Sequence, residues 1–270
     1  MNKIIFFVIG GLLIIIFGFG IYRWLFAVNP NDTQPVMEEP PANVNKINTL
    51  PLAQRPYIAL VPHSNPSGCD GVDLVVKNLK NGEKKLEAEI EYVTEKKIEG
   101  ITVHREFPDD NAKHLPIEFG TCSKGRCLCH DQIKGGSLTL YFEGEQDYAL
   151  KGDFTVENVG DKEGKLTSRD VRLNLDVQNI LSKDTDVLIM NTFGLPEDLS
   201  DKVLVGPYGV FIEAMDKLKG PITYTLQSKD VVWGQLQFYN GNRWTILDPK
   251  IDGETAKFET DELGVVILTE

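Results

Sequence analysis

The chain has 270 residues, of which 40 are acidic and 28 basic, so its formal net charge is −12 at neutral pH. A surface this acidic repels nucleic-acid phosphates and anionic lipid headgroups, which excludes nucleic acid as a partner. The length suffices for one large or two small domains beyond an N-terminal segment.

Residues 1–27 contain an apolar run from Ile4 to Tyr22 that carries no charge. A helix of this length spans about 28 Å, close to the hydrocarbon thickness of a bilayer. A cleaved signal peptide is the alternative, but the run exceeds the usual h-region of ~7–15 residues, and Arg23 follows where a small-residue cleavage site is expected. We therefore predict a single-pass signal anchor in the cell membrane, with the rest of the chain outside the cytoplasm.

Residues 28–56 hold many of the chain's 14 prolines and show almost no periodic apolar pattern. This composition predicts an extended, semi-rigid linker that lifts a domain off the membrane. A docking segment for a proline-recognising partner is the less common alternative.

Residues 57–182 are dominated by alternation of apolar and polar side chains, which predicts β-strands with one buried and one wet face. Polar, glycine-containing turns separate these runs. Many short amphipathic strands at such spacing indicate an antiparallel β-sandwich. The clearest runs are KKLEAEIEYVT (84–94), SLTLYF (137–142), DYALKGDFTV (147–156) and VRLNLDV (171–177).

Residues 183–270 form a second cluster of short apolar runs, which predicts a second β-sandwich. Asn240-Gly241 lies between two of the runs and is a strong hairpin signal. Asp252-Gly253 supplies the next turn. Only residues 214–220 have the pattern of a short helix. The predicted fold is mainly β, with two antiparallel sandwich domains behind a transmembrane helix and a Pro-rich linker.

The C-terminal stretch of this second cluster reads GQLQFYNGNRWTILDPKIDGETAKFETDELGVVILTE. It resembles the closing strands of Ig-like β-sandwich modules in prokaryotic membrane-anchored surface proteins. Those modules commonly end with an aromatic strand, a Trp-containing strand, a short Asp-Gly turn and a final apolar strand. The resemblance implies an Ig-like fold and an extracytoplasmic setting, and it carries no active site across.

The stretch GTCSKGRCLCH, residues 120–130, holds three of the four cysteines and a histidine. A c-type haem needs C-x-x-C-H, whereas this stretch has C-x-C-H. A zinc site from these thiols and His130 is chemically feasible, but the usual C-x-x-C knuckle is absent. A thioredoxin-like centre also needs C-x-x-C ahead of a helix, and the flanks here read as strands.

An even number of cysteines outside the cytoplasm favours structural disulfides. A bond between Cys127 and Cys129 would close a small strained ring. We favour a bond from Cys122 to Cys127 across a short turn and a second bond from Cys69 to Cys129.

The common catalytic and nucleotide-binding motifs are absent, namely H-E-x-x-H, G-x-S-x-G, Walker A and G-x-G-x-x-G. Acidic pairs offer Ca²⁺ ligands, although solvated turns are the more common outcome. The pairs are Asp70/Asp73, Asp109/Asp110 and Asp248/Asp252. Aromatic residues that would form a glycan or peptide platform if exposed are Tyr208, Trp233 and Trp244. No catalytic, metal or cofactor residue is predicted.

Two classes of function therefore compete. The favoured one is a non-enzymatic interaction or scaffold protein of the cell envelope, tethered to the membrane by its N-terminal helix and binding an envelope protein or a glycan. The alternative is a hydrolase-like envelope enzyme whose acidic site assembles only in three dimensions. A cleft with two carboxylates about 5–10 Å apart would favour the enzyme.

Overall fold

The computed structural model describes residues 47–65, 68–95, 97–107, 113–124, 126–213, 218–229 and 234–270. Residues 43–270 form one compact unit. The predicted transmembrane anchor, most of the predicted linker and residues 214–217 of the predicted short helix lie outside the described residues. Within the described ranges, no helix has the length and apolar character needed to cross a membrane.

The chain is mainly β, as its alternation predicts. A single turn of 3₁₀ helix, η1 (Leu52–Gln54), precedes the first strand. The strands up to the middle of the chain are β1 (Tyr57–His63), β2 (Gly71–Lys77), β3 (Lys85–Val93), β4 (Ile98–Glu106), β5 (Lys113–Glu118), β6 (Gly120–Ser123), β7 (Arg126–Cys129), β8 (Gly135–Glu143) and β9 (Tyr148–Asn158). The remaining strands are β10 (Lys165–Thr167), β11 (Leu173–Asp176), β12 (Asp186–Asn191), β13 (Val203–Phe211), β14 (Ile222–Gln227), β15 (Gln235–Tyr239), β16 (Trp244–Leu247), β17 (Lys250–Asp252), β18 (Thr255–Thr260) and β19 (Val265–Thr269).

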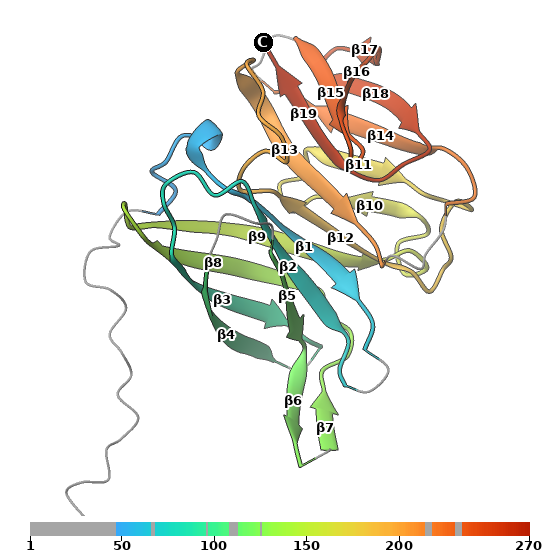
Figure 1. Ribbon diagram of the computed structural model, residues 1–270. Helices are drawn as coiled ribbons and strands as arrows, with labels where there is room; N and C mark the ends of the chain where they lie inside the picture. Colours follow the sequence, from blue (N-terminus) through green and yellow to red (C-terminus); the bar gives the residue numbers. More distant parts are fainter. Residues whose placement is uncertain are drawn as a thin grey trace, which may run out of the picture. The chain divides into compact units, whose positions relative to one another are not determined.

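A nine-stranded antiparallel sheet forms the centre of the unit, in the order β16-β15-β19-β13-β12-β9-β8-β3-β4. A three-stranded sheet, β1-β2-β5, packs on the half that contains β3, β8 and β9, and a five-stranded sheet, β10-β11-β14-β18-β17, packs on the half that contains β13, β15 and β19. Figure 1 shows the hairpin of β6 and β7 projecting beyond these sheets from the end of β5.

The four sequence runs with the clearest alternation each form a strand, namely β3, β8, β9 and β11. In β3, Leu86, Ala88, Ile90 and Tyr92 are buried, while the intervening glutamates are half-buried or exposed. The predicted Asn-Gly turn joins β15 to β16, and the predicted Asp-Gly turn joins β17 to β18. Both glycines have positive φ, which explains why the turns need them.

Two hydrophobic cores lie on opposite faces of the nine-stranded sheet. The first core fills the space between β1-β2-β5 and the half that contains β3, β8 and β9. The second core fills the space between the five-stranded sheet and the half that contains β13, β15 and β19. Strand β12 contributes to both, because Leu188 and Met190 face the first core while Val187 and Ile189 face the second. This explains its continuous apolar run, which is typical of a strand buried on both faces.

Strand β1 is also buried on both faces. Ile58 and Leu60 belong to the first core, whereas Tyr57 and Ala59 join a third cluster with Val265 of β19. The three-stranded sheet is therefore held between the two halves of the central sheet.

The predicted modules, 57–182 and 183–270, share the central sheet through the pairing of β9 with β12. The second core also takes residues from before position 183, including Val159, Leu166 of β10 and Leu175 of β11. Alternation gives each strand a dry face, but it does not say which sheet the strand joins.

Candidate functional site

A cleft of about 670 Å³ opens at one end of the first core. Its walls come from the end of β1, the turn between β1 and β2, the segment after β7, the start of β12 and Glu213, which lies just after β13. These segments are far apart in sequence. They meet because β1 and β9 end, and β12 begins, at the same side of the fold.

The cleft is acidic. Among the described residues that line it, no lysine or arginine occurs, and two imidazoles, those of His63 and His130, stand beside five carboxylates. The carboxylates are those of Asp70, Asp131, Asp184, Asp186 and Glu213. With so many acidic groups around one cavity, the local potential favours a positively charged ligand.

Hydrogen bonds hold three of these carboxylates in place. The backbone N–H of Asn65 donates to Asp70 Oδ1 at 3.0 Å, and Ser64 Oγ donates to Glu213 Oε2 at 2.7 Å. The Asn158 amide donates to Asp186 Oδ1 at 2.9 Å. Because these donors are neutral, they orient the carboxylates without cancelling their charge.

Two disulfides support the wall beside Cys129. Cys69 is bonded to Cys129, with the Cα atoms 5.2 Å apart, and Cys122 is bonded to Cys127 across the β6–β7 hairpin. This is the connectivity that we favoured from the sequence. The sulfur atoms of Cys69, Cys122 and Cys127 lie within 4.8 Å of one another, but as disulfide sulfurs they offer no thiolate to a metal ion.

The wall at His130 is fixed by a tyrosine and a glutamate. Tyr92 Oη lies 2.7 Å from His130 Nδ1, and His130 Nε2 lies 3.7 Å from Glu99 Oε1. Burial and the negative charge of Glu99 raise the pKa of Tyr92 to about 12. The phenol is therefore protonated at neutral pH, and it shares a hydrogen bond with Nδ1 of His130. Nδ1 of His130 is thus hydrogen-bonded within the wall, whereas Nε2 faces Glu99 at a distance too long for a hydrogen bond.

The other histidine of the cleft, His63, has no serine partner. His63 Nδ1 faces Asp73 Oδ1 at 3.6 Å, which is too long for a hydrogen bond. The neighbouring Ser64 hydroxyl is bonded to Glu213 instead. The described residues of the cleft thus contain no hydrogen-bonded pair of a nucleophile and a base, which acyl transfer by a serine requires.

The carboxylates of the cleft are also too dispersed for a preformed cation site. Outside the cysteines, no group of three metal-ligating side chains comes together within the described residues. The acidic pairs Asp70/Asp73 and Asp248/Asp252 therefore belong to no such group. The pair Asp109/Asp110 lies outside the described residues. A ligand with several spaced positive charges fits this arrangement better than a single ion.

A second concavity, of about 300 Å³, is apolar and lies beside the third cluster. It is lined mainly by Tyr57, Val61, Val75, Phe211, Tyr239 and Val265. Lys77 and His114 also line this concavity.

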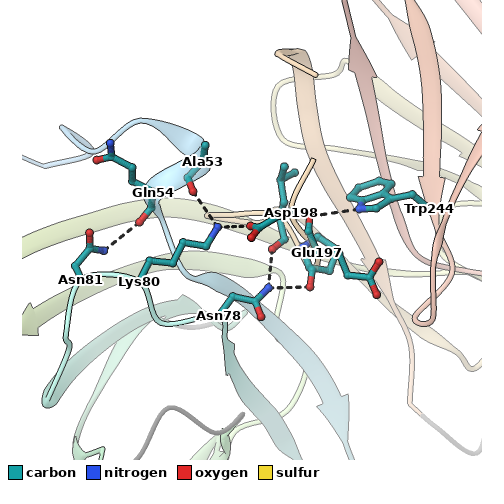
Figure 2. A network of polar contacts seen from close by, with 10 residues as sticks. Ala53, Gln54, Asn78, Lys80, Asn81, Glu197, Asp198 and Trp244 are labelled. Carbon is teal, nitrogen blue, oxygen red and sulfur yellow. Dashed lines mark hydrogen bonds and ion pairs between the residues drawn. The ribbon is translucent and has the colours of Figure 1, made fainter. Parts of the chain in front are cut away.

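A polar network closes one side of this region and joins the two halves of the unit (Figure 2). Asn78 donates through its amide to the carbonyls of Leu195 and Pro196, at 3.3 and 2.8 Å. Lys80 Nζ bonds to the Ala53 carbonyl at 2.9 Å and to Asp198 at 2.5 Å. These internal contacts hold the loop before β13 against the segment that follows β2.

Tyr208 and Trp244, the two described residues of the aromatic platform that we considered, do not come together. Tyr208 is buried in the second core, where its hydroxyl donates to Asp170 at 2.5 Å. Trp244 packs against Tyr239, with ring centroids 5.3 Å apart, and its indole N–H points to the Glu197 carbonyl at 3.4 Å (Figure 2). Trp233 lies outside the described residues. Tyr208 was thus wrongly considered as an exposed residue, because its strand is buried on both faces.

Sequence reasoning missed the cleft itself. Asp184, Asp186 and Glu213 precede or follow apolar strands without any shared motif, and no spacing links them to Asp70 or Asp131. Comparisons with protein-family models, with curated proteins and with solved structures found no match to the chain. The acidic cleft is therefore the feature from which a function has to be argued.

Proposed function

We propose that this chain is a membrane-tethered protein of the cell envelope that acts by binding, with residues 1–27 as its anchor, residues 28–56 as its spacer and the β halves as Ig-like sandwich modules outside the cytoplasm. Its proposed ligand is a basic peptide segment of another envelope protein, held in the acidic cleft.

The charge of the cleft carries this proposal. Five carboxylates face a cavity whose described lining contains no lysine or arginine. An extended cationic segment would meet several of them in succession, and each contact would speed encounter and select the partner by charge. A glycan without positive charge could donate hydroxyl hydrogen bonds to the carboxylates but would gain no attraction between opposite charges.

Two further observations support the proposed location. The two disulfides are typical of proteins in oxidising compartments outside the cytosol. The uncharged run from Ile4 to Tyr22 is long enough for a membrane helix.

A hydrolase remains the second candidate, because imidazoles and carboxylates do meet in one cleft. Against it, Nδ1 of His130 is hydrogen-bonded to Tyr92 rather than to a nucleophile of the cleft, and the Ser64 hydroxyl is bonded to Glu213 rather than to a histidine. Turnover of a glycoside or peptide by the purified chain would favour this candidate over the first.

Calorimetric titration of the full chain with a lysine-rich peptide tests the binding proposal. We expect binding that weakens with salt, since exposed charge pairs are screened. Neutralising the cleft with Asp184→Asn, Asp186→Asn and Glu213→Gln together should weaken it by at least about tenfold, or roughly 1.4 kcal/mol.

A matched control removes three exposed charges from elsewhere, with Asp252→Asn, Glu254→Gln and Glu259→Gln. This variant has the same net charge as the cleft variant and should bind almost like the unmodified chain. Equal weakening by the two triple variants would refute the cleft as the binding site, because it would show attraction to the overall charge alone.

A further inference from the structure

Strand β4 is an open edge of the central sheet. It ends the nine-stranded order, and in the described residues it pairs only with β3 (Figure 1). With nine residues it is the longest described strand that ends a sheet; the opposite edge, β16, has four. The pairing of β3 with β4 runs residue for residue without a bulge. Edge strands of this length and regularity are templates for a further strand.

The free backbone groups of β4 can be identified from the ends of its pairing with β3. Phe107 N donates to the Lys84 carbonyl at 2.7 Å, and Thr94 N donates to the Lys97 carbonyl at 3.0 Å. Odd-numbered residues around β4 therefore bond to β3. Because bonding direction alternates along a strand, the even-numbered ones present their N–H and C=O groups to the open edge. These are Ile98, Gly100, Thr102, His104 and Glu106.

The side chains of β4 that point to the core side are only partly covered. Ile101 and Val103 pack against the first core and remain half-buried. They are flanked by Glu99 and by Arg105, which is exposed. The sequence of this face is thus an acid, two aliphatic residues and a base.

This order is self-complementary under two-fold symmetry. If β4 pairs antiparallel with β4 of a second copy and Thr102 faces Thr102, then Glu99 faces Arg105 and Ile101 faces Val103. Both contacts occur twice. The even-numbered residues face one another in the same register, as the direction of their free backbone groups requires.

The neighbouring antiparallel registers lack this complementarity. Centring the pairing on Ile101 places Glu99 opposite Val103, and centring it on Val103 places Arg105 opposite Ile101. Both registers leave the charges against aliphatic side chains. The match therefore selects one register from the three that the backbone allows around the middle of the strand.

Glu99 has the capacity for the additional contact. Lys97 Nζ and His130 Nε2 both approach its Oε1 atom, which leaves Oε2 for a further donor. Arg105 donates to the carbonyl of His104 at 2.7 Å and forms no ion pair with any described carboxylate.

We propose that β4 is the homodimer interface of this protein, at which two copies pair antiparallel about Thr102 and join their central sheets into one. The partner is a second copy because the strand, read in reverse, itself supplies a base opposite Glu99 and an aliphatic side chain opposite Ile101. Inward-pointing charges on an edge strand often serve to prevent association. Here their opposite signs at symmetric positions make the self-pairing favourable.

Charge reversal tests this proposal with the full chain purified in detergent. Arg105→Glu places two glutamates opposite each other at both ends of the interface, and Glu99→Arg places two arginines there. Light scattering should show a dimer for the unmodified chain, and each variant should raise the dimer dissociation constant at least tenfold. An equal mixture of the two variants should restore a dimer that contains one copy of each, because every charged pair is then opposite in sign.

Thr102→Cys provides an independent readout of the register. Oxidation should join two copies of this variant covalently, since Thr102 faces itself across the two-fold axis, whereas Gly100→Cys should give no such product. A monomeric unmodified chain, a dimer unaffected by Arg105→Glu or crosslinking of Gly100→Cys in place of Thr102→Cys would each overturn the proposal. Circular dichroism of each variant checks that the fold is retained.

Discussion

Leu188 and Ile189 are neighbours on β12, yet they bury their side chains in different hydrophobic cores. Both are almost completely buried, with exposures of 0 % and 1 %. Because one strand supplies both cores, neither half can lose its packing without disturbing the sheet that supports the other.

We therefore expect Leu188→Ala and Ile189→Ala each to lower the free energy of unfolding by about 3 kcal/mol. Both should shift one common transition, seen alike by circular dichroism and by tryptophan fluorescence during urea unfolding. Ile246→Ala is the matched control, since Ile246 is 62 % exposed and should change stability little. Two separate transitions would show that the halves unfold independently.

The two disulfides should differ in their effect on stability. The bond between Cys69 and Cys129 spans 60 positions, and that between Cys122 and Cys127 spans 5. In the chain-entropy model the first contributes about 4 kcal/mol and the second about 2 kcal/mol. Replacing both cysteines of each pair by serine avoids re-pairing of a freed thiol. Thermal unfolding of the two double variants checks the order, and a larger loss at the hairpin pair would contradict it.

Glu83 should make stability depend on pH. Burial by itself raises the pKa of its carboxyl, but hydrogen bonds from Tyr148 Oη at 2.5 Å and from the Asn81 side chain and backbone at 2.9 Å outweigh burial and lower the pKa. A carboxyl with a lowered pKa stabilises the fold above its unfolded value of about 4.3 and loses that contribution as the pH falls through its folded value.

The stability difference between the unmodified chain and Glu83→Gln should therefore be largest near neutral pH and shrink below about pH 4. Urea unfolding at several pH values measures this difference. Glu254→Gln, at an exposed site, should show no comparable trend. A difference that stays constant with pH would mean that ionisation of Glu83 does not stabilise the fold.

Val171 offers a site for stabilisation. It lies in the turn between β10 and β11, is 57 % exposed and has a φ of 63°, a left-handed conformation that is unfavourable for a β-branched residue. Val171→Asn should raise the free energy of unfolding by about 1 kcal/mol, because asparagine tolerates this conformation. Val171→Ile keeps the unfavourable branching and should bring no gain. Denaturant midpoints of the two variants distinguish them.

The sequence alone determined the strands and the local turns. Alternation in KKLEAEIEYVT fixes the two faces of β3, and Asn240-Gly241 fixes a hairpin, because both signals depend on neighbouring residues only. Local geometry disfavours a bond between Cys127 and Cys129, which leaves two connectivities, and the one that we favoured, with Cys69 bonded to Cys129, is the one in the structure.

Only the tertiary structure decided what covers each face. The apolar run of β12 indicates burial on both sides, but nothing in it says that Leu188 joins the core that includes β1 and β3 while Ile189 joins the core that includes β13 and β14. The acidic cleft arises in the same way, since Asp70, Asp131 and Asp186 come together only through strands paired over long sequence distances. Alternation indicates whether a strand face is buried or exposed. Which sheet covers a buried face depends on pairing between strands far apart in the sequence, and this pairing is a property of the folded chain.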